Sequence, residues 1–407
     1  MTEPNRPPVT PETAGHRIYF VSNGVFGYQP AGGDIHLLHT VRAACRAGWQ
    51  VECFGGPALQ HHLQEWNLPA RMIFTSPAGD RELRRHNLFG QLRLLWTFFR
   101  RFVATLTRLK QIQKHVVAFS PTDYWFDVLP VVFSRAKLKV AVLQMQAPSL
   151  REVIFRTRMD VEPARIASLH YCFSQWLSLK ALSWCRQKRL VVVQPLLRAA
   201  VLEKGFRPAE VACIPNGVDV ETADSAPAQE KRFDVVWMGR VHRQKGIEDL
   251  LTALQCLNRE FPRFRALLIG DLKPALGARI EELGLSASVE FSGYVSGAEK
   301  FRQLKSARLF LMPSRHEGLP IVVGEALASG LPVVAYELEM YRSFFGPLVH
   351  YVPCFDVETF CASAAGALKR LRAGEQLLED AELARFKKTN SWPEIERQLM
   401  ELLTPSI

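Results

Sequence analysis

The stretch that decides the fold is residues 314–335, which read SRHEGLPIVVGEALASGLPVVA. Pro320 suits the first position of a helix, where its missing N–H leaves no hydrogen bond unmade, and Gly330 suits the left-handed residue that ends a helix. The apolar run from Leu331 to Ala335 predicts a buried strand directly afterwards. We therefore expect a short helix that begins just after Gly318 and leads into a strand of an α/β fold.

Two glutamates mark this stretch: Glu317 precedes the helix, and Glu325 is expected about two turns inside it. The unpaired N–H groups and the positive dipole end of the helix would face a ligand over Gly318 and Leu319, which favours a phosphate or a ring of hydroxyls. Leu, Val and Ala fill most of the helix, so a carboxylate buried there needs a partner, such as sugar or ribose hydroxyls. The alternative is that both glutamates are ordinary solvated charges.

A second ligand-binding loop is predicted after the apolar strand at residues 233–238. Gly239 ends this strand, and Lys245-Gly246 opens an amphipathic helix. Arg240 and Lys245 would therefore extend from the carboxyl end of a strand, where open parallel sheets bind ligands. Their charges would stabilise a departing diphosphate more in the transition state than in the ground state. Two solvated cations on a loop are the alternative.

Four motifs in the same order resemble the family 4 retaining nucleotide-sugar glycosyltransferases of the GT-B fold. They are the glutamate-x7-glutamate segment at 317–325, IPNGVD at 214–219, WMGRVHRQKG at 237–246 and VEFSGY at 289–294. The resemblance implies an α/β protein of GT-B type, with two Rossmann-like domains whose parallel sheets face a central cleft. It also implies a last helix that returns to the first domain, and WPEIE at 392–396 is similar to the start of that helix.

The resemblance also assigns roles to individual residues. Arg240 and Lys245 would hold the donor diphosphate and Glu317 the sugar hydroxyls, which makes these three predicted catalytic residues. Glu325 would bind the ribose, and backbone near Tyr294 the base. The other implied contacts are Gly318, Leu319 and Pro320 at the helix start, and Gly32 and Gly33 in a loop of the first domain that borders the diphosphate and the acceptor. His316 is either a sugar contact or a packing neighbour.

The chain departs from the family at one position. The family places a histidine near the reacting carbon after its fourth or fifth strand, whereas residues 116–127 contain none. Asp123 is the nearest polar candidate and is the fourth predicted catalytic residue, while Asp127 is expected to be a first-turn helix charge. The missing histidine keeps a rival open: a non-catalytic GT-B subunit that binds a nucleotide sugar or assembles at a membrane.

Length and composition predict a two-domain globular protein, because 407 residues exceed what one core usually supports and the chain is 48% hydrophobic and 22% charged. Strands are expected near 17–22, 49–54, 70–74, 115–119, 138–144 and 189–194 in the first half, and near 211–214, 233–238, 264–269, 288–291, 308–312, 332–336 and 350–353 in the second. Helices are expected near 33–47, 84–113, 123–135 and 163–184. We expect a tail over 1–15, domains over 16–205 and 206–385, and a closing helix over 386–407.

Cysteine usage and hydropathy bear on the compartment. The eight cysteines are scattered without a C-x-x-C pair, and neither a secretory leader nor an apolar run of eighteen residues is found. These features predict a cytoplasmic protein, either free or peripheral on the membrane.

The net charge of +11 favours an acidic partner. Its clearest concentration is the helix expected around 88–114, where an apolar stripe is flanked by cations and aromatic residues. The stripe is Leu88, Leu92, Leu95, Phe99, Phe102, Leu106 and Leu109, and the cations are Arg93, Arg100, Arg101, Arg108, Lys110 and Lys114. With its stripe on the sheet, this helix would present cations to an anionic membrane surface; a core-packed helix with a solvated basic face is the alternative. No nucleic-acid-binding motif accompanies the charge.

Together these features predict a retaining, metal-independent glycosyltransferase that needs no cofactor. It would move a hexose or N-acetylhexosamine from a nucleoside-diphosphate sugar to a hydroxyl of a glycan or lipid-linked acceptor. No two Asp residues have the D-x-D spacing of the metal-dependent alternative fold. Retention of configuration, with the diphosphate taking the acceptor proton, is implied by the resemblance alone.

Overall fold

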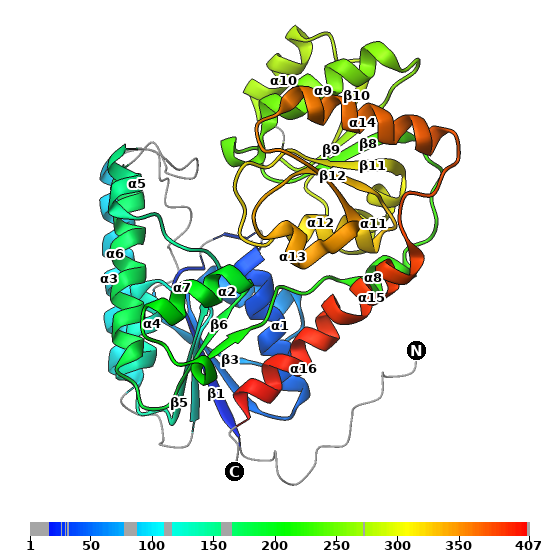
Figure 1. Cartoon of the computed structure of the whole chain (residues 1–407). Helices are drawn as coiled ribbons and strands as arrows, with labels where there is room; N and C mark the ends of the chain where they lie inside the picture. The colour runs from blue at the N-terminus through cyan, green and yellow to red at the C-terminus, as the bar shows by residue number, and fades with distance from the viewer. Residues whose placement is uncertain are drawn as a thin grey trace. The chain divides into compact units, whose positions relative to one another are not determined.

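The computed structural model describes residues 16–25, 27–28, 30, 32–76, 88–109, 116–155, 165–271 and 273–404. The chain divides into two compact units: unit 1 is Met1–Asn216 with Ile395–Ile407, and unit 2 is Gly217–Glu394. Each unit is a parallel sheet with helices on both of its faces (Figure 1). The expected tail at 1–15 lies outside the described residues.

Unit 1 contains a seven-stranded sheet in the order β3-β2-β1-β4-β5-β6-β7. Its strands are β1 (Arg17–Ser22), β2 (Gln50–Gly55), β3 (Arg71–Phe74), β4 (Val116–Ser120), β5 (Leu138–Leu143), β6 (Lys188–Val192) and β7 (Val211–Cys213). Its helices include α1 (Gly32–Arg46), α2 (Pro57–Glu65), α3 (Leu88–Leu109), α4 (Trp125–Phe133), α5 (Leu150–Phe155), α6 (Arg165–Ser183) and α7 (Pro195–Glu203). The strand expected over 211–214 had been assigned to the second half, but it pairs with β6, Val211 opposite Leu190, and completes this first sheet.

Unit 2 contains a six-stranded parallel sheet in the order β10-β9-β8-β11-β12-β13. Its strands are β8 (Phe233–Met238), β9 (Ala266–Ile269), β10 (Val289–Gly293), β11 (Ala307–Met312), β12 (Val333–Tyr336) and β13 (Val349–Val352). The helices are α8 (Val220–Ser225), α9 (Ile247–Glu260), α10 (Pro274–Glu282), α11 (Gly297–Lys305), α12 (Ile321–Ala328), α13 (Tyr341–Phe345), α14 (Val357–Arg372), α15 (Asp380–Asn390) and the first residues of α16 (Trp392–Leu403).

Apolar runs explain why these segments form strands. Parallel sheets are covered by helices on both faces, so their central strands are apolar at almost every position. All six residues of β8 are buried, and so are Leu309–Met312 of β11. The α/β class predicted from these runs is confirmed, and the limits of every strand lie within two residues of those expected.

The α3 helix packs differently from the sequence prediction. The stripe expected to face the sheet does so only in part, since Leu92 is 54% and Phe99 46% exposed, while Leu95, Phe102 and Leu106 are half-buried and Leu109 is buried. Phe98 and Arg101, which lie outside that stripe, point inward with 8% and 1% exposure. Phe98 stacks on Phe126 of α4 at 3.9 Å between ring centroids. The Arg101 guanidinium donates hydrogen bonds to the backbone carbonyls of Asn23 and Val25, which follow β1. The Arg101 prediction is therefore corrected to a buried cation. Lys110 and Lys114 lie outside the described residues.

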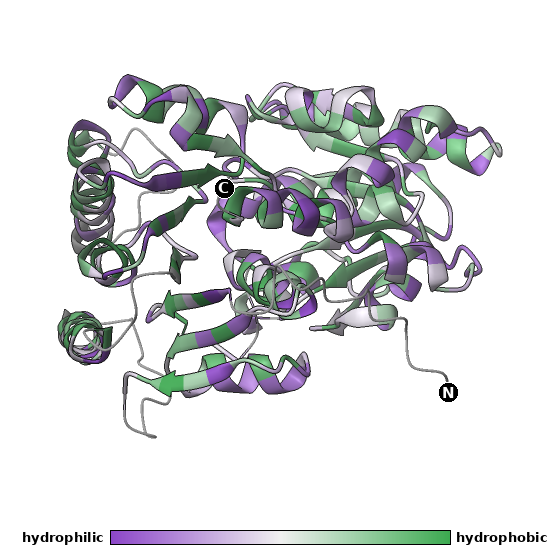
Figure 2. Ribbon diagram, turned by 90° about the horizontal axis from the view of Figure 1, so that it is seen from below, coloured by the Kyte–Doolittle hydropathy of each residue, from purple (hydrophilic) through white to green (hydrophobic). Residues whose placement is uncertain are grey.

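Several large apolar side chains of unit 1 are exposed, among them Leu92, Trp96 and Phe99 on α3. Figure 1 places α3 and α6 along the same edge of unit 1, and the ribbon in Figure 2 has apolar colouring at intervals along the helices of that edge. No helix within the described ranges combines the length and the apolar character needed to cross a bilayer.

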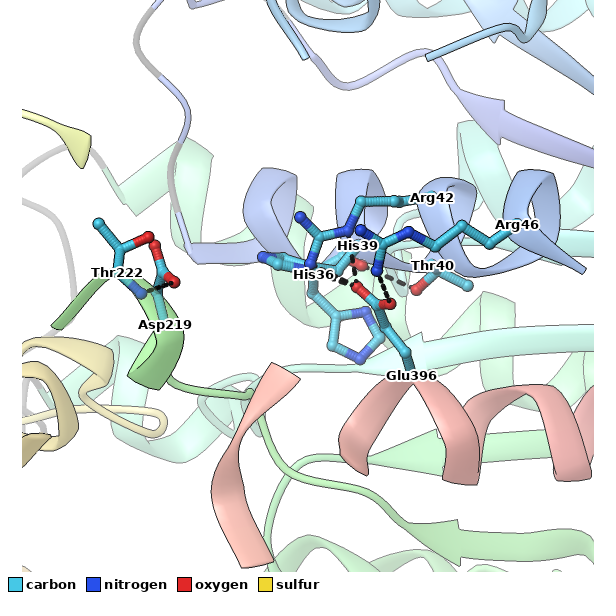
Figure 3. A network of polar contacts seen from close by, with 8 residues as sticks. All are labelled: His36, His39, Thr40, Arg42, Arg46, Asp219, Thr222 and Glu396. Carbon is cyan, nitrogen blue, oxygen red and sulfur yellow. Dashed lines mark hydrogen bonds and ion pairs between the residues drawn. The ribbon is translucent and has the colours of Figure 1, made fainter. Parts of the chain in front are cut away.

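The last helix, α16, is fixed to unit 1 by a buried carboxylate (Figure 3). Glu396 accepts hydrogen bonds from His39 at 2.8 Å and from Arg42 at 2.7 and 2.9 Å, and Arg46 lies 3.4 Å from its second oxygen. Burial opposes its ionisation, but the bonds from His39 and Arg42 outweigh this and lower the pKa of Glu396. The buried side chains of Ile395, Leu399 and Leu403 form the apolar side of the same helix.

We predict that Glu396→Gln will lower the free energy of unfolding by roughly 1.5–3 kcal/mol, because it weakens charge-assisted bonds while keeping the shape of the side chain. The lowered pKa means that the carboxylate stabilises the protein above its unfolded pKa and ceases to do so as the pH falls through the folded value. The difference between wild type and variant in urea melts should therefore shrink below about pH 4.5. Glu401→Gln, on an exposed ion pair of the same helix, is the control, and an equal loss in both variants would contradict the prediction.

Candidate functional site

Two loops meet at the centre of the unit 2 sheet. Strand order reverses between β8 and its neighbour β11, so the loops that follow these strands leave toward opposite faces and open a crevice at the carboxyl edge. Gly246 lies in the loop after β8 with φ +63°, and a Cβ there would stand 1.9 Å from the Pro313 carbonyl oxygen of the loop after β11. Arg315 N donates to Gln244 O at 2.7 Å and joins the same two loops. Only glycine permits this close approach.

The crevice brings together two of the predicted site residues. Lys245 Nζ lies 2.6 Å from Glu317 Oε1, and the two side chains are only 15% and 11% exposed. These residues are 72 positions apart in the chain, and each follows one of the two strands at the reversal. The pair concentrates one cation and one anion at the edge where parallel sheets bind ligands.

A buried ion pair holds the segment that carries Glu317. Arg315 donates to both oxygens of Asp249 on α9, at 2.6 and 3.0 Å, and Tyr336 donates to the same carboxylate at 3.0 Å. A bidentate arginine contact fixes orientation as well as position. The backbone on either side of His316 is therefore held against α9 and β12, and His316 itself is half-buried.

Helix α12 starts slightly later than predicted. It begins at Ile321, with Pro320 as the capping residue, and it ends at Ser329 before Gly330, whose φ is +75°. Glu325 is therefore the fifth helical residue, a little over one turn inside rather than two. The helix is short because Gly330 adopts the left-handed conformation that stops it, as the sequence predicted.

Glu325 has a partner that sequence reasoning missed. Lys300 Nζ on α11 lies 2.5 Å from Glu325 Oε1, and the side chains are 16% and 8% exposed. In the sequence nothing distinguishes Lys300 from a solvated surface lysine. The ion pair becomes evident only when the fold brings α11 and α12 together. Both glutamates of the motif are thus paired with lysines within unit 2.

The other predicted residues of unit 2 surround these pairs at different depths. Arg240, directly after β8, is exposed, and Tyr294, directly after β10, is 47% exposed. Gly318 is half-buried, whereas Leu319 and Pro320 are buried. The structure therefore brings Lys245 together with Glu317 and leaves Arg240 exposed to solvent.

In unit 1 the corresponding reversal lies between β1 and β4, and a polar network fills it. Asn23 N donates to Asp127 Oδ1 at 2.6 Å, and Arg101 Nη1 donates to Asn23 O at 2.6 Å. Thr75 and Thr105 bond the Asn23 side chain. Burial raises the pKa of Asp127 to about 7, against the hydrogen bond from Thr122. Asp127 lies in the first turn of α4 as predicted, but its function in the fold is to hold the backbone after β1.

Gly32 and Gly33 are the first two residues of α1 rather than loop residues. Among the residues that the structure describes, none lies within 4 Å of the position that a Cβ on Gly33 would take. Open space at the start of a helix permits a ligand to approach the backbone closely. The role of both glycines in ligand binding remains a prediction.

Asp123 lies after β4 but inside the protein, with 4% exposure. It accepts a hydrogen bond from Gln175 Nε2 of α6 at 2.6 Å, and that amide also donates to Met145 O at 2.9 Å. Burial raises the pKa of Asp123 to about 6. The structure thus gives Asp123 a partner on α6, and its predicted catalytic role remains a prediction.

Charged side chains of both signs lie near the carboxyl edge of the unit 2 sheet. Arg240 and Lys245 follow β8, and Glu317 and Glu325 lie on either side of the start of α12. Their roles in ligand binding remain predictions. Nowhere in the described ranges do three His, Cys, Asp or Glu side chains gather as a set that could hold a metal ion.

Comparison with known proteins identifies the sequence pattern around these residues. Residues 220–378 match the model of the family described as Glycosyl transferases group 1. A phosphatidyl-myo-inositol mannosyltransferase of Mycolicibacterium smegmatis is 31% identical over 204 residues, which cover 46% of this chain and 50% of that protein. A GDP-mannose:cellobiosyl-diphosphopolyprenol alpha-mannosyltransferase of Xanthomonas campestris is 33% identical over 132 residues, covering 31% and 35%. The chain spans about half the length of the first of these curated relatives.

Solved structures extend the similarity of fold to nearly the whole chain. HepE of Anabaena, in complex with UDP and glucose, superposes with a TM-score of 0.69 at 16% identity, covering 95% of this chain and 99% of HepE. The paired α/β units described above are therefore a GT-B fold, as the sequence predicted.

We predict that Gly246→Ala will lower the free energy of unfolding by at least about 2 kcal/mol, because alanine strains a left-handed residue and its Cβ would meet the Pro313 carbonyl. Gly277→Ala is the matched control. Gly277 lies inside α10 with nothing within 4 Å of a new Cβ, so alanine should stabilise that helix by up to about 1 kcal/mol. Urea melts that show the same sign for both variants would contradict the account of the crevice.

Proposed function

We propose that this chain, whose residues 220–378 match the group 1 glycosyltransferases and whose fold is GT-B, transfers a hexose or N-acetylhexosamine from a nucleoside-diphosphate sugar. The acceptor is a hydroxyl of a glycan or of a lipid-linked saccharide. The transfer retains the anomeric configuration and requires neither a metal ion nor a cofactor. The names of the two mannosyltransferases support a hexosyl donor and a lipid-linked acceptor.

The observation that carries the proposal is the Lys245–Glu317 pair at the strand reversal of unit 2. In this structure Lys245 and Glu317 neutralise each other's charge at 2.6 Å. A donor diphosphate would draw Lys245 and Arg240 to its oxygens, and sugar hydroxyls would take the place of Lys245 as donors to Glu317. The site is thus complementary to a ligand that is anionic at one end and rich in hydroxyls at the other.

Charge development explains how these residues would accelerate transfer. As the glycosyl bond breaks, the nucleoside diphosphate gains negative charge, and fixed cations stabilise this charge more than that of the intact donor. The backbone that carries Lys245 is held by Gly246 and by the contact between its loop and the loop after β11, so only the lysine side chain has to move when the donor binds. In a retaining transfer the departing diphosphate takes the proton of the acceptor hydroxyl.

The direct test is to incubate the protein with uridine and guanosine diphosphate sugars, to follow the released diphosphate, and to analyse the anomer formed on a saccharide acceptor. Tight binding of a nucleoside diphosphate without turnover on any acceptor would favour the rival, a non-catalytic binding subunit. One observation favours this rival: Asp123 is buried and accepts a hydrogen bond from Gln175. Residues 116–127 contain no histidine, so the loop after β4 then offers no free side chain in place of the family's histidine.

We predict that Lys245→Ala will lower turnover by on the order of a hundredfold or more, comparable to the loss of one oxyanion donor. The substrate affinity should change less than the turnover, because the charge acts mainly in the transition state. Lys388→Ala, which removes an exposed lysine of α15, is the control for charge alone. Unchanged turnover in the Lys245 variant would remove this lysine from the mechanism.

A separate prediction concerns Glu325, the proposed ribose acceptor. Glu325→Gln should weaken nucleoside-diphosphate binding in calorimetry by roughly 1.5–3 kcal/mol, because it replaces a charge-assisted hydrogen bond with a neutral one. The same change breaks the ion pair with Lys300, so Lys300→Met is measured alongside. If both variants lose stability and neither loses affinity, the carboxylate serves only to join α11 and α12.

A further inference from the structure

The long helices α3 and α6 of unit 1 turn apolar side chains toward solvent. On α3 the exposed residues follow spacings of four, three and four, and on α6 they follow spacings of four and three, so each set forms one helical face. The two sets, which we call the outer face, are Leu92, Trp96, Phe99 and Val103 on α3 and Leu169, Phe173 and Trp176 on α6. Trp96 and Trp176 are each 60% exposed.

The two halves of the outer face belong to one surface. Both helices pack against α4, which lies between them in the fold, and Phe98 of α3 lies parallel to His170 of α6 with 6.4 Å between ring centroids. Figure 1 shows both helices along the same edge of unit 1. Neighbouring rings on each helix contact one another, since Trp96 stacks on Phe99 at 5.7 Å and Phe173 lies 5.9 Å from Trp176.

Charge on these helices has a single sign. Neither α3 nor α6 contains an aspartate or a glutamate, whereas Arg93, Arg100, Arg108 and Lys180 are exposed on them. Arg93 and Arg100 directly follow Leu92 and Phe99 of the outer face. An occupant of this surface must therefore accept both apolar side chains and positive charge.

A bilayer surface that contains anionic lipid meets both requirements. Tryptophan and phenylalanine rings favour the boundary between headgroups and acyl chains, and flanking cations are attracted to anionic headgroups. A second copy of the chain would meet this surface with the same cations, because a two-fold contact pairs a patch with itself. Exposed apolar patches of this kind on a folded chain indicate an interaction site.

We propose that the outer face is a docking surface for the headgroup region of an anionic lipid bilayer. The apolar residues enter the interface, and the four exposed cations lie against lipid phosphates. The sequence pattern had assigned the apolar stripe of α3 to the sheet and the cations with an aromatic rim to lipid; in the structure Leu92 and Phe99 of that stripe also lie on the outer face. The proposal does not depend on sugar transfer, because none of its residues belongs to the site in unit 2.

The test is flotation of the full chain with vesicles of phosphatidylcholine and phosphatidylglycerol, and with phosphatidylcholine alone, at low and high salt. The wild type should bind the anionic vesicles and lose binding as salt rises. Replacing Arg93, Arg100, Arg108 and Lys180 with Gln should weaken this binding by on the order of a hundredfold or more, since each cation near an anionic surface contributes about fivefold. The control variant makes the same change at Arg232, Arg259, Arg370 and Lys388, which are exposed in unit 2, and should bind as the wild type does.

A second measurement tests the apolar contact separately. Lipids brominated near the headgroup should quench tryptophan fluorescence of the wild type, and Trp96→Phe with Trp176→Phe should remove most of that quenching while binding persists. Wild-type protein that ignores anionic vesicles at low salt would overturn the proposal, as would a charge variant that binds like its control. A dimer in solution that Phe99→Ser with Phe173→Ser converts to a monomer would assign the surface to self-association and would equally overturn it.

Discussion

The reversal of strand order at the centre of each sheet is the constraint on which the rest of the structure depends. Parallel strands release all of their following loops at one edge, and at a reversal the neighbouring loops turn to opposite faces, so no helix covers the backbone between them. In unit 2 this uncovered point lies between β8 and β11. Gly246 permits the two loops to touch, and the charges of Lys245 and Glu317 then meet at 2.6 Å. The polar chemistry of the unit follows from that contact.

Unit 1 has the same reversal of strand order, but different side chains fill it. Between β1 and β4, Asp127 accepts a hydrogen bond from the backbone N–H of Asn23, and Arg101 donates one to the backbone carbonyl of Asn23. The side chains of all three residues are almost completely buried. A cation buried in this way must be satisfied by several acceptors, and the backbone carbonyls after β1 provide them. The same topology thus supports a partly exposed ion pair in one unit and a sealed structural network in the other, because the residues supplied by the following helices differ.

Much of the fold could be predicted from local sequence, since apolar runs and helix-ending glycines act within a few residues. The strand limits and the stop at Gly330 are examples. Errors arose where distant residues decide the outcome. Arg101 turns inward because its acceptor is Asn23, 78 positions earlier, and two residues of the apolar stripe of α3, Leu92 and Phe99, consequently face solvent and not the sheet. Lys300 was missed because its partner Glu325 lies on another helix. Hydrophobic periodicity locates a helix but does not tell which of its faces meets the core when a buried polar network competes.

Unit 1 is formed by two separate segments of the chain, Met1–Asn216 and Ile395–Ile407, and this has a consequence for synthesis on the ribosome. Arg42 and its carboxylate partner Glu396 are 354 residues apart, and at about 5–20 residues per second the interval between them is roughly 20–70 s. Throughout this interval α1 carries His39 and Arg42 without the anion that they share in the finished protein, while unit 2, a continuous segment from Gly217 to Glu394, can fold alone. A nascent first unit must therefore wait with an incomplete surface, and a chaperone that recognises this surface would release the protein only after its final helix has emerged.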